Sequence, residues 1–379
     1  MSSATTTTAR GTDPVRQART PAPGLFLSLL AVCSAVTAAN IYLAAPLLPL
    51  MARDFGSAPS AIAWIASVAQ LGYAVGLLFF APLGDRANRR RLVAGLTLVT
   101  ALALGASAAA PGAAALAAAM FVASAATVIP QLLVPLVAER APVERRARHV
   151  AAVIAGLFTG IVAARVLGGL AGQAFGWRWV FAGAAVLTLA LGLATAVVLP
   201  SRQRRPGPLF AGLVALPSVL RSSPELWRAC VRQAGMFGAW SALWTSLALL
   251  LTGPEYGLST ATAGLFGLFG LTASAVAPLA GGLVDRFGAA RVVASAYLIA
   301  AVSVPLFWLG GHVLWALFAA AVAVHAALVA SHVANQTLAL TTTSTPATAN
   351  TAYVVAGFAG GAAASALAGT AFSHFGWGG

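Results

Sequence analysis

The residues that could do chemistry in this chain are few, and Arg165 is the first of them. It is the one charged residue that we place inside a predicted membrane span, in the outer half of the fifth. No Asp or Glu falls at the centre of a predicted span, so Arg165 must bind carbonyls, water, an acid at a helix end or a substrate anion. A charge in a bilayer costs about 2.5–3.5 kcal/mol or more, so we expect Arg165 to face the bundle interior or a wet cavity. A structural role and a substrate-binding role stay equally open.

The tenth predicted span carries a stripe of polar side chains. His325, His332 and Gln336 are spaced by seven and four residues and share one helical face, and Asn335 adjoins it. Histidine changes charge near neutral pH, so this stripe is a candidate proton carrier. Hydrogen bonding between helices is the alternative, and we place it first.

A second group of polar and aromatic residues falls near the middle of other predicted spans, or toward the inner half in the case of Gln131. Taken singly, each is more typical of packing than of ligand binding. Together they indicate a midplane cavity suited to an amphipathic organic substrate. The group consists of Asn40, Gln70, Tyr73, Gln131, Trp240 and Trp244.

Composition identifies an integral membrane protein. The chain is 60% hydrophobic and 8% charged, its mean hydropathy is +0.88, and a soluble domain carries roughly 25% charged residues. The net charge is +14, all 22 basic residues are Arg, and they cluster in segments between the apolar ones, which indicates membrane orientation rather than nucleic-acid binding. The sequence has no metal-ligand cluster, phosphate-binding Gly loop or nucleophile motif, so we expect neither an enzyme nor a cofactor.

The apolar pattern predicts an all-α fold with eleven spans, each near the ~20 residues that a bilayer requires. Small residues dominate them, and Gly156 and Gly160 form a face for close helix packing on the fifth. The predicted spans are 24–51, 60–83, 92–110, 112–138, 149–172, 178–199, 230–252, 258–284, 292–310, 312–340 and 350–372.

These spans divide into two halves. Residues 1–23 are a polar, disordered tail, residues 24–199 form the first half, residues 200–228 a Pro-rich linker, and residues 229–379 the second half. Arg is concentrated in the tail, the linker and every second loop, so we expect the N-terminus and the linker in the cytoplasm.

An offset of 200 residues relates the halves. It connects Asp85 to Asp285, and the tripeptide at 175–177 to the one at 375–377, both Phe-Gly-Trp. This is a duplication at the scale of half the protein. In the first half, 178–199 follows the tripeptide as a sixth span. The twelfth span that the duplication predicts is absent from the second half.

Several motifs of this chain occur together in one known family. They are Asn40-Ile-Tyr42-x3-Pro46-Leu-Leu-Pro49, Gln70-Leu-Gly72-Tyr73, Pro82-Leu-Gly-Asp85-Arg86, Pro130-Gln131-Leu-Leu-Val-Pro135, Gly156-x3-Gly160-x4-Arg165-x2-Gly168-Gly169, Gly176-Trp177-Arg178, His332-Val-Ala-Asn335-Gln336-Thr337 and Asn350-x2-Tyr353. Together they resemble the major facilitator superfamily, most closely the bacterial drug:proton antiporters, including the acriflavine-sensitivity group. The resemblance implies two six-helix halves, the second lacking its last helix, that rock about a midplane site in the bacterial inner membrane. It also implies proton-coupled export of small amphipathic compounds. We expect the transporter to be a monomer.

The resemblance further implies that two Asp-Arg loops stabilise the outward-open arrangement. Ala81 and Asn88 replace glycines that the family usually has in the first loop, whereas the second keeps them. We favour this latch over basic loops that serve topology alone, because both loops keep the Asp. The latch residues are Asp85, Arg86, Arg89, Gly281, Asp285, Arg286, Gly288 and Arg291.

Two other functions stay open. One is import or facilitated passage of a small metabolite, in which Arg165 would hold a carboxylate. The other is a non-transporting membrane protein, which the lack of a buried carboxylate and of a twelfth helix would favour.

Overall fold

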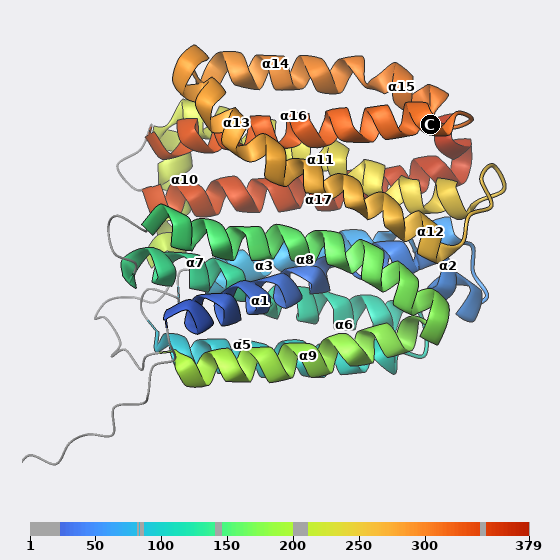
Figure 1. Ribbon diagram of the computed structural model, residues 1–379, viewed down its shortest axis with the longest axis horizontal. Helices are drawn as coiled ribbons and strands as arrows, with labels where there is room; N and C mark the ends of the chain where they lie inside the picture. The colour runs from blue at the N-terminus through green and yellow to red at the C-terminus, as the bar shows by residue number, and fades with distance from the viewer. Residues whose placement is uncertain are drawn as a thin grey trace, which may run out of the picture.

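The computed structural model describes residues 23–81, 83, 87–140, 146–199, 211–341 and 346–378. Throughout these ranges the chain forms helices joined by turns and short loops, without a strand (Figure 1). This confirms the predicted all-α class. Ten of the described helical segments are long and apolar enough to cross a membrane.

Eight α-helices and one 3₁₀ turn build the first half. They are α1 (Pro23–Tyr42), α2 (Ala44–Asp54), η1 (Pro59–Ile62), α3 (Trp64–Phe80), α5 (Arg89–Ala108), α6 (Ala113–Ala126), α7 (Ile129–Arg140), α8 (Arg146–Phe175) and α9 (Trp177–Val198).

The second half is also built from helices in succession, and the short helix α10 connects it to the first half. Its elements are α10 (Ala211–Ser222), α11 (Pro224–Thr252), α12 (Thr260–Leu265), η3 (Phe266–Leu271), α13 (Thr272–Phe287), α14 (Ala289–Val302), α15 (Val304–Leu309), α16 (Leu314–Thr341), α17 (Pro346–Phe375) and η4 (Gly376–Gly378).

The eighth predicted span, 258–284, is the one predicted span in which the described residues contain no helical segment long enough to cross a membrane. It consists of α12, η3 and α13 in succession, so its apolar helical stretch Thr260–Leu271 is shorter than a span. The 3₁₀ stretch contains Gly267 and Gly270, and glycine weakens an α-helix by about 1 kcal/mol relative to Ala. Both glycines face α8 at close range, so the irregular geometry accompanies a close packing contact.

The predicted linker is partly helical. Within it, α10 packs on α11 and α17. The seventh span begins at Pro224 rather than at 230, because Ser223 caps α11 by accepting a hydrogen bond from the Leu226 amide at 3.3 Å. Residues 200–210 lie outside the described part of the chain.

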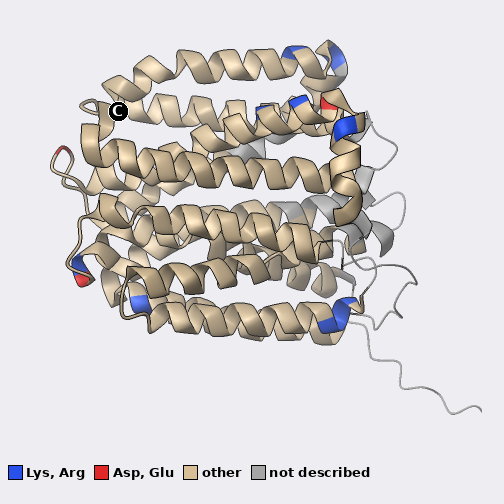
Figure 2. Ribbon diagram, turned by 180° about the vertical axis from the view of Figure 1, so that it is seen from behind, with Lys and Arg blue, Asp and Glu red and all other residues tan. Residues whose placement is uncertain are grey.

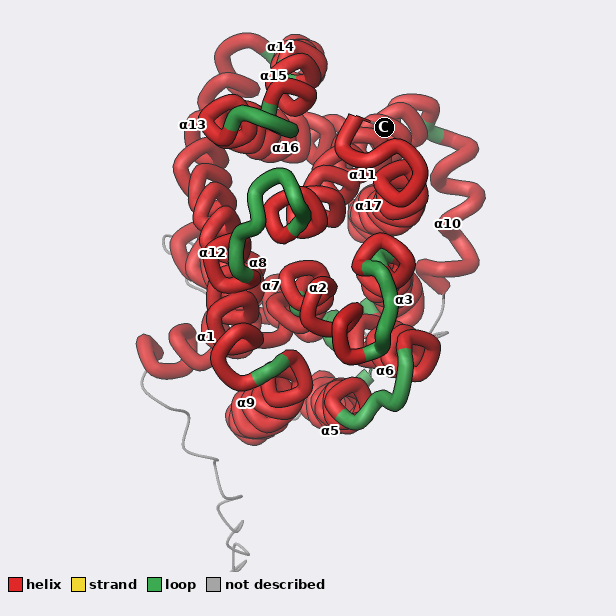
Figure 3. Tube along the Cα trace, turned by 90° about the vertical axis from the view of Figure 1, so that its right-hand side faces the viewer, coloured by secondary structure: helices red, strands yellow, loops and turns green. Residues whose placement is uncertain are grey.

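The two halves lie side by side, with α1 to α9 on one side and α11 to α17 on the other (Figure 3). We call the end that carries Asp54, Phe175, Thr252 and Phe375 the distal end, and the opposite end, which carries Arg89, the proximal end. The described charged residues gather near the two ends of the bundle, and the ribbon between them is almost free of charge (Figure 2).

Small residues let helices of the first half approach closely. A Cβ on Gly160 of α8 would lie 1.9 Å from the carbonyl oxygen of Ala35 in α1, and one on Gly156 would lie 2.2 Å from that of Ala31. The predicted small-residue face therefore packs α8 directly onto the α1 backbone.

The two predicted latch loops differ in backbone geometry. Gly288 ends α13 with φ of 81°, the left-handed geometry that glycine favours. Asn88, which stands where the family usually has glycine, has φ of −69° and caps α5 by accepting a hydrogen bond from the Arg91 amide at 3.3 Å. Asp85, Arg86 and the side chain of Asp285 lie outside what the structure describes, so the latch stays a prediction.

The other predicted latch residues are distributed around the proximal ends of their helices. Gly281 lies within α13, Arg89 is buried at the start of α5, and Arg291 is exposed at the start of α14. The guanidinium carbon of Arg286 lies 5.1 Å from the Phe287 ring centroid.

Candidate substrate site between the two halves

Arg165 is buried where α8 meets the second half. Its guanidinium carbon lies 4.0 Å from the ring centroid of Trp244, 4.8 Å from that of Trp240 and 5.3 Å from that of Tyr42. The side chain is 4% exposed, so these rings replace water around the cation. Cation–π contacts contribute about 2 kcal/mol when desolvated. The expectation that Arg165 faces the bundle interior is confirmed.

The aromatic rings leave hydrogen-bonding capacity unused. Arg165 Nη1 and Trp244 Nε1 are both buried and have no hydrogen-bond partner within the described ranges. A buried donor without a partner costs about 1–3 kcal/mol, and more when it is charged. The site therefore presents two N–H groups to any acceptor that reaches it.

His325 of α16 completes the cluster as a neutral imidazole. The Trp240 indole donates to His325 Nε2 at 2.9 Å, and His325 Nδ1 lies 3.0 Å from the Ala321 carbonyl oxygen. A nitrogen that accepts carries no proton, so the proton is on Nδ1, which donates to the carbonyl. His325 thus gives Arg165 no negative partner.

An aromatic chain continues from this cluster toward the first half. Ring centroids are 5.2 Å apart for Trp240 and Phe237, 4.9 Å for Phe237 and Phe358, and 4.5 Å for Phe358 and Tyr73 of α3. Gln131 Nε2 then donates to the Tyr73 hydroxyl at 3.4 Å. Rings from α3, α11 and α17 therefore fill the middle of the interface.

Gln70 also bridges the halves, because its Oε1 accepts a hydrogen bond from the Ser241 hydroxyl of α11 at 2.9 Å. The structure thus brings seven of the predicted site residues to one interface. They are Gln70, Tyr73, Gln131, Arg165, Trp240, Trp244 and His325.

Glycines close the interface on the distal side of Arg165. A Cβ on Gly267 of η3 would lie 2.6 Å from the Arg165 Cβ, and one on Gly264 of α12 would lie 2.6 Å from the Arg165 carbonyl oxygen. A cavity of only about 20 Å³ remains between Arg165, Trp244, Pro46 and Gly264. It has room for about one water molecule.

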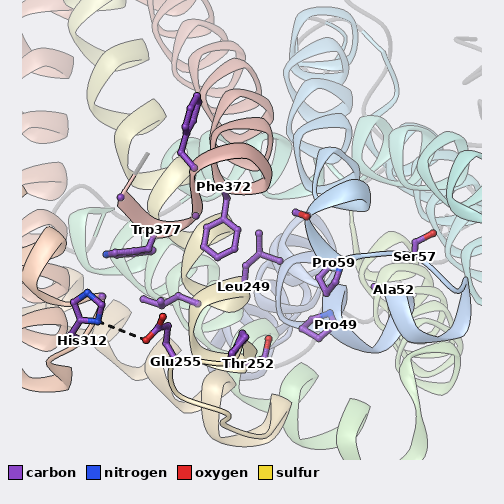
Figure 4. Close-up of a pocket in the computed structure, with 18 of the residues that line it drawn as sticks. Pro49, Ala52, Ser57, Pro59, Leu249, Thr252, Glu255, His312, Phe372 and Trp377 are labelled. Carbon is purple, nitrogen blue, oxygen red and sulfur yellow. Dashed lines mark ion pairs between the residues drawn. The ribbon is translucent and has the colours of Figure 1, made fainter.

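A much larger cleft of about 640 Å³ opens at the distal end (Figure 4). Pro49, Ser57 and Pro59 of the first half line one wall. Glu255, His312 and Trp377 of the second half lie across from them, and Thr252 lines both this cleft and the small cavity beside Arg165. His312 Nδ1 lies 3.7 Å from Glu255 Oε2.

The remaining predicted site residues lie elsewhere. Asn40 is buried inside the first half, where its Nδ2 donates to the Thr127 hydroxyl at 3.3 Å and to the Thr188 hydroxyl at 3.0 Å. Gln336 Nε2 donates to Asn350 Oδ1 at 2.9 Å within the second half. These hydrogen-bond partners belong to the same half as Asn40 or Gln336, which indicates a role in holding that half together.

His332 and Asn335 belong to a proximal network of the second half. His332 Nδ1 lies 3.3 Å from the Tyr353 hydroxyl, which donates to Gln233 Oε1 at 2.7 Å. Asn335 Oδ1 accepts from Arg232 Nε at 2.8 Å. The predicted stripe on α16 therefore serves two places. His325 lies at the interface between the halves, whereas His332 and Asn335 belong to this proximal network.

Arg232 lies at the start of the seventh predicted span, and the helix that forms this span begins earlier than predicted. Because α11 begins at Pro224, its proximal turns contain both Glu225 and Arg232. Arg232 Nη2 donates to Glu225 Oε1 at 2.5 Å. The seven-residue spacing between them, two helical turns, was the signal available in the sequence.

Sequence and structure comparisons agree with this architecture. A profile described as Major Facilitator Superfamily matches residues 30–369. "Probable transporter SCO4007" of Streptomyces coelicolor is 77% identical over 94% of this chain and 83% of its own length. "Uncharacterized transporter YgaY" of Escherichia coli O157:H7 is 32% identical over 94% of this chain and 91% of its own length.

Two solved structures share the fold. A bacterial homologue of the human lysosomal transporter Spinster, in an inward-facing, unoccupied conformation, aligns with a TM-score of 0.72 and 17% identity over 96% of this chain and 84% of its own. The nucleoside transporter NupG aligns with a TM-score of 0.72 and 14% identity over 93% of this chain and 94% of its own. The chain therefore belongs to the Major Facilitator Superfamily and is a multi-pass membrane transporter rather than an enzyme.

Proposed function

We propose that this transporter exports small amphipathic organic compounds in exchange for protons, at a site centred on Arg165. The observation that supports this most is the buried cluster of Arg165, Tyr42, Trp240 and Trp244 at the interface of the two halves. Aromatic faces suit the apolar body of such a compound, and the unused N–H groups suit a polar end.

The proposed alternating-access mechanism would break and re-form contacts between the two halves. On the distal side of Arg165, α8 packs against α12 and η3 across glycines, and η1 packs against α17. Opening the distal end would part these contacts and withdraw Arg165 from Trp240 and Trp244. The cluster is then a binding site that changes shape as the halves rock.

His325 is the proposed proton carrier. Protonation of Nε2 would place an N–H against the Trp240 indole N–H and would add a positive charge beside Arg165 of α8, the charged group that faces the ring. The Trp240 bond would break, which would loosen the aromatic cluster. Proton binding and rearrangement of the site are coupled in this scheme.

The distribution of Arg supports a bacterial inner-membrane location with the proximal end in the cytoplasm. Described Arg residues at or near the proximal end include Arg89, Arg90, Arg91, Arg221, Arg228, Arg232, Arg286 and Arg291, whereas Arg53 and Arg178 lie at the distal end. The two curated relatives named above are bacterial.

The test is transport by purified protein in proteoliposomes that contain a pH-sensitive dye. An imposed proton gradient should drive movement of at least one amphipathic compound from a panel that holds organic anions as well as the cations acriflavine and ethidium, and adding that compound should in turn move protons. Solute movement that does not respond to the gradient would contradict proton exchange.

A second function has an observation in its favour. Unpartnered Arg165 Nη1 suits a carboxylate, so import or facilitated passage of a small anionic metabolite is the competing proposal. Higher accumulation in cells that express the protein would favour it over export. Failure of correctly folded protein to move any solute tested would favour the non-transporting alternative.

A further inference from the structure

We propose that Arg165 and Trp244 form a carboxylate-binding subsite, so that the transported compounds are organic monoanions with an aromatic or apolar body. This inference rests on the proposed function, in which the interface around Arg165 holds the substrate. It adds the chemical class of the substrate and the atoms that recognise it.

The first argument is the pair of donors. Arg165 Nη1 and Trp244 Nε1 are both buried and both lack a partner, and the guanidinium carbon lies 4.0 Å from the Trp244 ring. Both unpartnered N–H groups belong to one cluster, and a carboxylate offers an oxygen for each of them. Charge-assisted hydrogen bonds are roughly twice as strong as neutral ones, so an anion gains more here than an amide or alcohol would.

The second argument is charge. The acids whose side chains the structure describes are Asp54, Glu225 and Glu255, and all three have partners elsewhere: Asp54 pairs with Arg178 at 2.8 Å, Glu225 pairs with Arg232, and Glu255 lies 3.7 Å from His312. His325 is neutral in its hydrogen-bonding arrangement. No described side chain neutralises Arg165, which leaves its positive charge available to a bound anion.

The third argument is access. The cavity beside Arg165 holds about 20 Å³, enough for a single small group, and Thr252 lines both this cavity and the distal cleft of about 640 Å³. The cleft walls include Phe372, Trp377 and Pro49, which suit an apolar body. A carboxylate beside Arg165 would therefore have its apolar body directed toward the cleft once the glycine contacts at Gly264 and Gly267 part.

The test measures binding without a gradient, so that it is independent of transport. Melting of the purified full chain in detergent is followed as benzoate is added, with benzamide as the neutral compound of the same shape and tetraphenylphosphonium as an organic cation. A ligand that binds the folded state stabilises it by RT ln(1 + [L]/Kd), so the melting temperature keeps rising as the ligand concentration exceeds Kd. We expect benzoate to raise it and benzamide to have a much smaller effect.

Variants assign the effect to the two donors. Arg165→Gln should weaken benzoate binding about 10- to 100-fold, since a charged hydrogen bond is lost, and Trp244→Phe about 2- to 10-fold, since a neutral one is lost. Trp179→Phe and Arg228→Gln are matched controls on exposed side chains and should bind benzoate as the parent does. If Arg165→Gln does not fold, Trp244→Phe still decides, because it keeps the aromatic ring.

Three results would overturn the subsite. Benzoate could fail to raise the melting temperature of the parent, benzamide could raise it as much as benzoate does, or both Trp244→Phe and Arg165→Gln could bind benzoate with the affinity of the parent. Tetraphenylphosphonium stabilising the parent while benzoate does not would instead assign the cluster to cations. Benzoate binding without transport of any solute would leave the subsite standing and remove the proposed function. Proton-coupled transport without benzoate binding would leave the proposed function standing and remove the subsite.

Discussion

The guanidinium carbon of Arg165 lies 4.0 Å from the ring centroid of Trp244, and this contact joins the two halves of the transporter. Arg165 belongs to α8 of the first half and Trp244 to α11 of the second. Because the contact crosses the interface, it exists only while the halves are close at this level. In the proposed alternating-access cycle this contact would form and break, which makes it a sensitive place to test that mechanism.

Gly267→Ala should disturb this interface. The added Cβ would lie 2.6 Å from the Arg165 Cβ, so η3 and α8 must move apart. We expect the melting temperature to fall by an amount equivalent to about 1–3 kcal/mol of overpacking. We also expect a cysteine placed on the distal side of α8 to become more reactive. Gly105→Ala on α5, whose Cβ meets nothing within 4 Å, is the control and should melt at or above the parent temperature. Equal melting of both variants would refute the close packing.

Gly160→Ala should destabilise the first half without changing the balance of transport states. Its Cβ would meet the Ala35 carbonyl oxygen at 1.9 Å, and both residues belong to the same half. A lower melting temperature with unchanged reactivity of distal cysteines is the expected result. Altered distal reactivity would mean that this contact also participates in opening.

Arg232→Gln should lower stability, because Glu225 and Asn335 lose a charged partner. The double variant Glu225→Gln with Arg232→Gln should cost less than Arg232→Gln alone, since no unpaired acid is left. Arg228→Gln is the control, because its pair with Glu225 is largely exposed and contributes about 0.3–0.5 kcal/mol. A double variant that melts lower than Arg232→Gln would show that the pair does not act as a unit.

Topology can be tested with single cysteines, since native Cys33 and Cys230 are buried. Ser57→Cys at the distal end and Ser222→Cys at the proximal end both occupy exposed positions. If the proximal end is cytoplasmic, a membrane-impermeant maleimide added to intact spheroplasts should label only Ser57→Cys. Labelling of Ser222→Cys in those sealed cells would instead show that the proximal end faces outward.

The proposed Asp-Arg latch predicts a loss of transport rate without an equal loss of folded protein. Asp285→Asn should reduce transport more than it reduces the amount of folded protein, because it would remove an ion pair made in one state. Asp85→Asn should act likewise but more weakly, since Asn88 gives the first loop an extended backbone where Gly288 gives the second a left-handed one. Parent rates in both variants would mean that the loops serve topology alone.

The fold could be predicted largely from the sequence because apolar length and Arg placement are strong signals in a bilayer. Helix interruptions were harder to predict. The 3₁₀ stretch at Phe266–Leu271 accompanies packing against Arg165 and Val162 of α8, a contact that no local pattern encodes. The start of α11 at Pro224 was missed because Glu225 and Arg228 interrupt the apolar pattern in its first two turns, although Ser223 and Pro224 form a recognisable cap.

The site was predicted in part for a similar reason. Position along the bilayer identified Arg165, Trp240, Trp244 and His325, but depth alone does not tell which way a side chain faces. Asn40 lies at a suitable depth and yet points to Thr127 and Thr188 within its own half. Tyr42, two residues later, lies against the guanidinium instead. Only the packing of α1 against α8 and α11 distinguishes them.

Transport by Arg165 variants tests the central claim most directly. Parent, Arg165→Lys, Arg165→Gln and the control Arg228→Gln are reconstituted at equal density, and initial rates of proton-coupled solute movement are compared after each protein is shown to be monodisperse. Lys keeps the charge but loses the planar fork, so we predict partial transport for Arg165→Lys, loss of most transport for Arg165→Gln and the parent rate for Arg228→Gln. Monodisperse Arg165→Gln that transports at the parent rate would contradict a substrate site at this residue.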